Sequence, residues 1–212
     1  MAPTPGVRPL SVFVRGLTPV LMALLLSASA HAAPLVDAVK RRDPDEVRAL
    51  LADKVDVNAR EGDGATALHW AVSADDVALV SLLLDAGART DIANDLGVTP
   101  LHLAAANASA VIAARLIEAG APVDAATPSG VTPLMEAARA GEPSIVRALL
   151  AKGASANARE TERQQTALMW AASRKQPEIV RALIAAGADL HARTVARTVT
   201  VMLDRGPGRE AK

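Results

Sequence analysis

Apolar residues recur along the chain in short stretches with helical spacing, separated by polar stretches that contain glycine. Leu101, Ala104 and Ala105 follow the i, i+3, i+4 spacing of one buried helix face. A second kind of stretch is longer and more apolar, as in residues 145–150, which read Ile-Val-Arg-Ala-Leu-Leu. The two kinds alternate, so the pattern predicts pairs of short amphipathic helices joined by turns.

The helical stretches recur with a fixed period. The threonines that open the shorter stretches, Thr66, Thr99, Thr132 and Thr166, are 33, 33 and 34 residues apart. A degenerate fifth copy begins at Ala33. A single helix pair cannot bury its apolar face, so we expect the copies to stack on one another.

The shorter stretches share a motif of threonine, proline or alanine, leucine, and histidine or methionine. Its structural residues are Thr66, Leu68, His69, Thr99, Pro100, Leu101, His102, Thr132, Pro133, Leu134, Thr166 and Leu168. We expect the threonine to cap the helix and the proline to occupy its first turn, where no N–H donor is needed. The longer stretches end at a glycine suited to the left-handed C′ position. These glycines are Gly87, Gly120, Gly153 and Gly187, whereas the first copy has Asp53-Lys54 at this point.

The motif and its period resemble the ankyrin repeat. The resemblance covers residues 33–194 and implies an all-α solenoid of about five stacked helix-turn-helix units with short turn or hairpin tips. The expected repeats are residues 33–63, 64–96, 97–129, 130–163 and 164–194. Residues 195–212 break the pattern, and we expect a degenerate C-terminal cap or a disordered tail there.

A polar residue recurs in each segment between units. We expect its side chain to bond to the backbone and tighten the turn. The residues are Asn58, Asp91, Asp124, Asn157 and His191.

Residues 1–32 have the features of a secretory signal peptide. Arg8 and Arg15 precede an apolar run at 17–26, and a small-residue segment follows. Cleavage is expected after Ala32, with Ala30 as the competing position. The apolar run is shorter than the ~20 residues that span a bilayer, so an uncleaved anchor is the less favoured alternative. This leader on a chain rich in alanine and arginine resembles those of bacterial exported proteins, so we expect a periplasmic or secreted protein.

Composition narrows the possible functions. The chain has 23 basic and 23 acidic residues, a 50% hydrophobic fraction and no cysteine. These values argue against a disordered chain and against a basic nucleic-acid binder, and they exclude cysteine chemistry. No phosphate-binding loop, nucleophile elbow or zinc-protease motif is present, so we expect neither an enzyme nor a cofactor.

The histidines and tryptophans of the repeats allow both a structural and a functional interpretation. His69 and His102 lie 33 residues apart, which makes a metal site between neighbouring units conceivable. A zinc site needs further ligands at set spacing, so we favour the structural hydrogen bonding that the resemblance implies, and no metal. Trp70 and Trp170 share one repeat position and are interpreted as packing residues, with an anchor for a partner as the alternative.

The resemblance also implies a concave face that binds another protein. The candidate contact residues are Asp63, Ser73, Asp95, Asn107, Glu136, Arg139, Arg163, Arg174 and Lys175. Their charge runs from acidic in the early repeats to basic in the late ones, which would orient a partner of opposite gradient. The alternative interpretation is an ordinary solvated surface.

These observations favour a monomeric, non-enzymatic protein-binding module without a membrane span. The alternative is a structural or protective stress-related periplasmic protein with no single specific partner. A small hydrolase within the solenoid is a third, disfavoured possibility.

Overall fold

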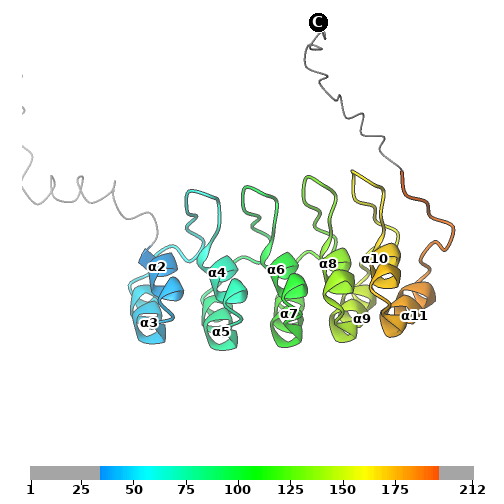
Figure 1. Cartoon of the computed structure of the whole chain (residues 1–212). Helices are drawn as coiled ribbons and strands as arrows, with labels where there is room; N and C mark the ends of the chain where they lie inside the picture. The colour runs from blue at the N-terminus through cyan, green and yellow to red at the C-terminus, as the bar shows by residue number, and fades with distance from the viewer. Residues whose placement is uncertain (1–33, 196–212) are drawn as a thin grey trace, which may run out of the picture.

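The computed structural model describes residues 34–195, which form ten helices in two layers. Figure 1 shows the helix pairs side by side in a row, with the connecting loops rising on one side. The layer next to these loops consists of α2 (Pro34–Lys40), α4 (Ala67–Ser73), α6 (Pro100–Ala106), α8 (Pro133–Ala140) and α10 (Ala167–Ser173). The outer layer consists of α3 (Pro44–Ala52), α5 (Val77–Asp85), α7 (Ala110–Glu118), α9 (Pro143–Ala151) and α11 (Pro177–Ala185).

This architecture confirms the all-α solenoid that the sequence predicts. Each inner helix packs against its own outer helix and against the next inner helix along the row. The predicted leader at residues 1–32 lies outside the described residues, as does the predicted tail from residue 196 onward. Within residues 34–195, no helix combines the length and apolar character needed to cross a membrane.

Four of the five inner helices, α4, α6, α8 and α10, start at threonine because its side chain and extended backbone serve the first turn. The Thr132 hydroxyl accepts a hydrogen bond from the Met135 N–H at 3.4 Å, and the Thr166 hydroxyl accepts one from the Met169 N–H. Pro133 follows as the first helical residue. Carboxylates do the same work for α3 and α5, which Asp43 and Asp76 cap respectively.

The outer helices end in a left-handed residue in all five pairs. Gly87, Gly120, Gly153 and Gly187 have φ values between 82° and 88°. In the first pair Lys54 adopts this conformation with a φ of 58°, although its side chain makes it less favourable than glycine. The first pair therefore keeps the left-handed turn after its outer helix although it lacks the motif glycine.

A single apolar core runs through all five helix pairs. Ala71, Ala104, Ala137 and Ala171 on the inner helices are fully buried, and their small side chains let neighbouring inner helices approach closely. Leucines of the outer layer close the core from the other side; these are Leu83, Leu116, Leu149 and Leu183.

Four loops connect successive pairs and form the raised tips in Figure 1. They comprise residues 53–66, 86–99, 119–132 and 152–166. Each tip is closed by a backbone hydrogen bond of hairpin type, for example from the Asn94 N–H to the Val98 carbonyl at 3.0 Å. Loop 152–166 holds one more residue than the others, which accounts for the 34-residue spacing. Gln164, two residues before Thr166, adopts a φ of 59°, at the position where the other tips have the left-handed glycines Gly64, Gly97 and Gly130.

Candidate protein-binding groove

A groove runs along the molecule between the loop tips and the exposed faces of the inner helices. It contains three hollows of about 140, 400 and 320 Å³, each between one loop and the next repeat. The first is lined by residues that include Trp70 and Ser73, the second by residues that include Leu103, and the third by residues that include Trp170. The repeat therefore places similar recesses at regular intervals along one face.

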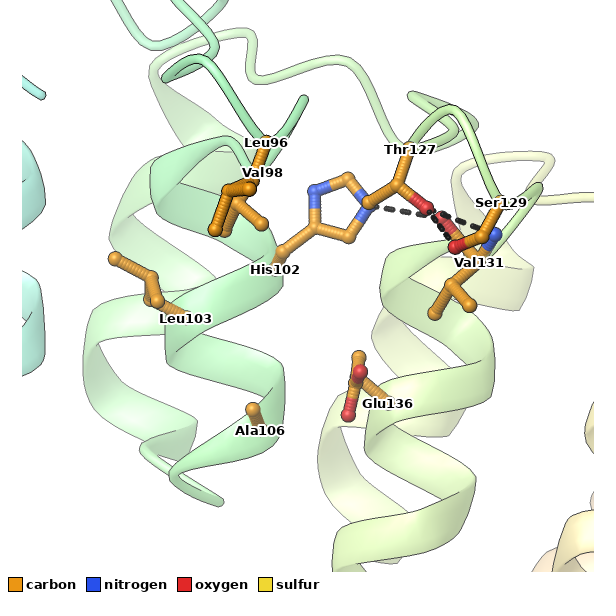
Figure 2. A pocket seen from close by; sticks show the side chains of 9 residues that line it. All are labelled: Leu96, Val98, His102, Leu103, Ala106, Thr127, Ser129, Val131 and Glu136. Atoms are coloured by element: carbon orange, nitrogen blue, oxygen red, sulfur yellow. Dashed lines mark hydrogen bonds between the residues drawn. The ribbon is translucent and has the colours of Figure 1, made fainter. Parts of the chain in front are cut away.

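The central hollow is bounded by two loops and two helices (Figure 2). Leu96 and Val98 come from loop 86–99, Leu103 from α6, and Val131 from loop 119–132. Leu96 is 73% exposed, although it is a large apolar side chain. Together with Val98, Leu103 and Val131 it makes the lining of the hollow mostly apolar. The remaining lining residues are His102, Ala106, Thr127, Ser129 and Glu136.

Two histidines join the start of an inner helix to the following loop. The Nε2 atom of His69 donates to the Val98 carbonyl at 3.0 Å, and that of His102 donates to the Val131 carbonyl at 3.1 Å. The Nδ1 atom of His69 accepts from the backbone N–H of Thr66 at 3.1 Å and from its hydroxyl at 2.9 Å. A carbonyl only accepts and an N–H only donates, so the ring is the neutral Nε2–H tautomer.

Burial also favours the neutral form of both rings. His69 and His102 are each 3% exposed. Burial lowers the pKa of both imidazoles below the ordinary histidine value, while the bonds to the Val98 and Val131 carbonyls oppose this change in part. Within residues 34–195, no group of three or more histidine, aspartate or glutamate side chains is arranged to hold a metal ion.

The two tryptophans are half-buried and face both the core and the groove. Each ring packs against the core and also lines a hollow. The Trp70 Nε1–H donates to Glu61 at 2.6 Å, and the Lys40 ammonium lies 4.2 Å from the Trp70 ring centre. Lys40 and Glu61 also form an ion pair at 2.6 Å. Lys40 and Glu61 have no signal in the sequence, because one lies at the end of α2 and the other in loop 53–66, and no motif joins them.

The candidate residues of the early repeats are exposed at the N-terminal end of the groove. The Asp95 carboxylate lies 3.6 Å from the Arg60 guanidinium, so its charge is partly balanced. The Asp63 carboxylate accepts the Ala65 N–H in its own loop at 2.9 Å. The Asn107 side chain donates to the Val72 carbonyl at 3.4 Å, and Ser73 lines the first hollow.

Of the candidate residues in the late repeats, two form an ion pair with each other and three form none within the described part of the chain. Glu136 and Arg139 form an ion pair at 2.6 Å along α8, so neither presents a free charge. Arg163, Arg174 and Lys175 are exposed, and none makes an ion pair within the described part of the chain. Arg163 lines the third hollow, and Arg174 and Lys175 lie at the C-terminal end of α10; these three cations are the basic end of the groove.

A buried carboxylate orders the loop beside these cations. Glu160 is 6% exposed and accepts hydrogen bonds of 2.7–2.9 Å from the backbone N–H groups of Glu162, Arg163 and Gln165. Burial by itself raises the pKa of this carboxyl, but the N–H donors outweigh that effect and hold the pKa below its usual value. Asn94 and Thr127 hold the tips of their loops at the same repeat position.

Comparison with known proteins agrees with this geometry. Residues 35–127 and 111–194 each match a family model described as ankyrin repeats in three copies. A comparison with curated proteins found no match.

Proposed function

Because the chain belongs to the ankyrin-repeat family, whose repeats indicate a protein–protein interaction module, we propose that it binds a partner protein in its groove without catalysing a reaction. The observation that carries this proposal is the row of three hollows, each with an exposed or half-buried large side chain at its edge. A protein segment placed along the groove would contact several repeats at once.

The groove is suited to binding because its walls are fixed before a partner arrives. His69 and His102 hold the loops to the inner helices, and Glu160 orders the last loop. A preorganised surface loses little conformational entropy on association, so more of the contact free energy appears as affinity. The unpaired cations Arg163, Arg174 and Lys175 would attract an acidic region of the partner and set its orientation.

We further propose that the protein acts outside the cytoplasm, as a monomer and without contact to nucleic acid. The signal-peptide features of residues 1–32 support export, and the balanced charge gives no basis for phosphate binding. Sequencing the N-terminus of the protein recovered from cells tests the export proposal. We expect a first residue at Ala33, and a chain that retains residues 1–32 would contradict cleavage.

Capture of a partner by charge-reversed variants tests the binding proposal. The full chain carries the changes Arg163→Glu, Arg174→Glu and Lys175→Glu. The matched control reverses three exposed arginines of the outer helices, by Arg115→Glu, Arg147→Glu and Arg181→Glu. We expect the wild type and the control to capture one stoichiometric partner and the groove variant to lose it.

The other outcomes of this experiment are informative. Equal capture by all three proteins would remove the basic end of the groove from the proposal. No stoichiometric partner for the wild type would favour the structural or protective role over specific binding.

A further inference from the structure

The two loops that bound the central hollow make no hydrogen bond with each other. At the other three junctions one loop tip donates to the preceding segment of the row. The Asp95 N–H donates to the Asp63 carbonyl at 2.9 Å, the Thr161 N–H to Ser129 at 2.8 Å, and the Val195 N–H to Arg163 at 2.9 Å. Within residues 34–195, the junction between loops 86–99 and 119–132 is the one without such a bond.

Proline explains the missing bond at the tip. The residue of loop 119–132 that corresponds to Asp95 and Thr161 is Pro128, which has no backbone N–H. Its ring lies against Gly97, where an added Cβ would be only 2.5 Å from the Pro128 Cδ. The Leu96 carbonyl, which corresponds to the acceptors at the other junctions, is therefore left without a donor from the next loop.

A second proline removes the bond at the base of the same junction. Elsewhere an Asn or Asp side chain accepts a backbone N–H of the next repeat, as Asn58 does from Arg89 at 2.8 Å. Two further examples are Asp124 with Ser155 and Asn157 with Asp189. Asp91 stands at this position opposite Pro122, which offers no N–H, and it pairs with Arg89 instead.

The open junction leaves an apolar recess. Leu96 extends from one loop at 73% exposure, and Leu103 and Val131 lie across the 400 Å³ hollow. The polar side chains on its wall are already satisfied. Glu136 pairs with Arg139, the hydroxyls of Thr127 and Ser129 bond to each other, and His102 donates to Val131. An aliphatic side chain fits this lining better than a polar one, since it requires no new hydrogen bond.

The charged residues beside the central hollow indicate which residues of the partner flank that aliphatic side chain. One repeat further along, Arg163 lines the third hollow with the buried Glu160 and the exposed Glu162, and Arg174 and Lys175 follow at the C-terminal end of α10. Within residues 34–195 none of the three cations makes an ion pair, so the exposed charges at this end are three cations and one carboxylate. Packed helices lie about 8–10 Å apart, and an extended chain rises about 3.3 Å per residue. The distance from the central hollow to the next one thus corresponds to about three residues of an extended segment.

From these observations, and resting on the proposed function of the groove, we propose the chemistry of the bound segment. It is an extended, acidic stretch of the partner that places one aliphatic side chain in the central hollow. A carboxylate about three residues away meets the basic end of the groove. The backbone N–H next to the aliphatic residue donates to the free Leu96 carbonyl. The two prolines keep this recess open by preventing the loops from bonding to each other.

Titration of the methyl-labelled full chain with synthetic peptides, followed by NMR, tests this proposal. The probe is a short glycine–serine peptide with one leucine and one glutamate three positions apart. We expect saturable shifts of the methyl groups of Leu96, Leu103 and Val131, and none at Val111 on the outer face. Replacing the peptide leucine by serine, or its glutamate by lysine, is expected to weaken binding at least about tenfold.

Two protein variants complete the test. Leu103→Ser should abolish the saturable shifts, whereas Val111→Ser, an exposed apolar control on α7, should leave them unchanged. Absence of saturable shifts with the leucine–glutamate peptide overturns the proposal, as does equal binding of the serine peptide. Shifts confined to the first or third hollow would overturn this assignment while leaving the groove as the binding face. Shifts confined to the outer helices would also overturn the proposed function.

Discussion

Histidine at the fourth motif position links two repeats through one side chain. In His69 and His102 the two ring nitrogens have opposite roles, one accepting from the capping threonine and the other donating to the next loop. Met135 and Met169 replace it in later copies and provide packing without this link. The early repeats thus depend on neutral imidazoles for their connection, whereas the later ones do not.

Stability should therefore depend on pH through these two residues. Their pKa is lower in the folded protein than the unfolded value of about 6.5, so the unfolded chain takes up protons first as the pH falls. The free energy of unfolding is expected to be constant above that pH and to decrease below it. Each histidine contributes a slope of at most about 1.4 kcal/mol per pH unit. Denaturant unfolding between pH 7.5 and 5 measures this slope.

A double variant isolates the histidine contribution. His69→Gln with His102→Gln lowers stability at every pH but removes the titrating groups, so the slope between pH 6.5 and 5 should largely vanish. A slope that persists unchanged in the variant would assign the pH dependence to other residues.

At the scale of elements, the turn inside each helix pair requires a left-handed residue. Gly141 supplies it in the fourth pair with a φ of 88°. The other pairs use residues with a side chain at φ values of 54° to 57°; these are Arg42, Asp75, Ala108 and Lys175. A Cβ makes this conformation less favourable, so four of the five turns carry a residue that is less stable there than glycine.

Ala108 offers the simplest test of this turn because it is exposed and its side chain makes no polar contact. Ala108→Gly is expected to raise the free energy of unfolding by up to about 1 kcal/mol, since relief of the left-handed strain exceeds the added entropy of the unfolded chain. The control Ala114→Gly, at an exposed position within α7, should lower it by about 1 kcal/mol. Thermal and urea unfolding measure both changes. Destabilisation by both substitutions would show that the turn is unstrained.

The helices were predictable from the sequence because their signals are local. Threonine, proline and the buried leucines mark the start and inner face of each short helix, and the period places the next copy. The loop junctions were not predictable in the same way. Pro128 matters only because Leu96, 32 residues away, lies opposite it, and such a pairing exists only after the repeats have stacked.

The pairing of charged side chains in the groove was likewise not predictable from the sequence. The sequence predicts Glu136 and Arg139 as partner contacts but not their ion pair, which forms because they lie one helical turn apart. Asp95 is similarly balanced by Arg60. What remains of the predicted gradient is its basic end, at Arg163, Arg174 and Lys175, because those side chains make no ion pair within residues 34–195.

At the scale of the whole molecule, the continuous core makes each helix pair dependent on its neighbours. Pairs in the middle of the row are covered on both sides, whereas the last pair, α10 and α11, is covered by described helices on one side. In such a linear array the total stability is close to a sum of repeat and interface contributions. Position in the row should thus decide how far the effect of a core substitution extends.

Two chemically identical substitutions separate these cases. Leu116 in α7 and Leu183 in α11 are both fully buried. Leu116→Ala is expected to cost about 2–5 kcal/mol and to shift the entire unfolding transition. Leu183→Ala should instead release the last pair first and broaden the transition, which urea titration followed by circular dichroism detects. Identical transitions for the two variants would contradict a linear array.

The measurement that most directly tests the groove as the binding face is site-specific photo-cross-linking in cells that express the full chain. One variant carries the photoreactive residue in place of Leu103, in the groove, and another carries it in place of Val111, on the outer face. Both positions are apolar and partly or largely exposed, so they differ mainly in the face that they sample. We predict one cross-linked partner from position 103 and none from position 111. A cross-link from position 111, or none from position 103, would contradict the account.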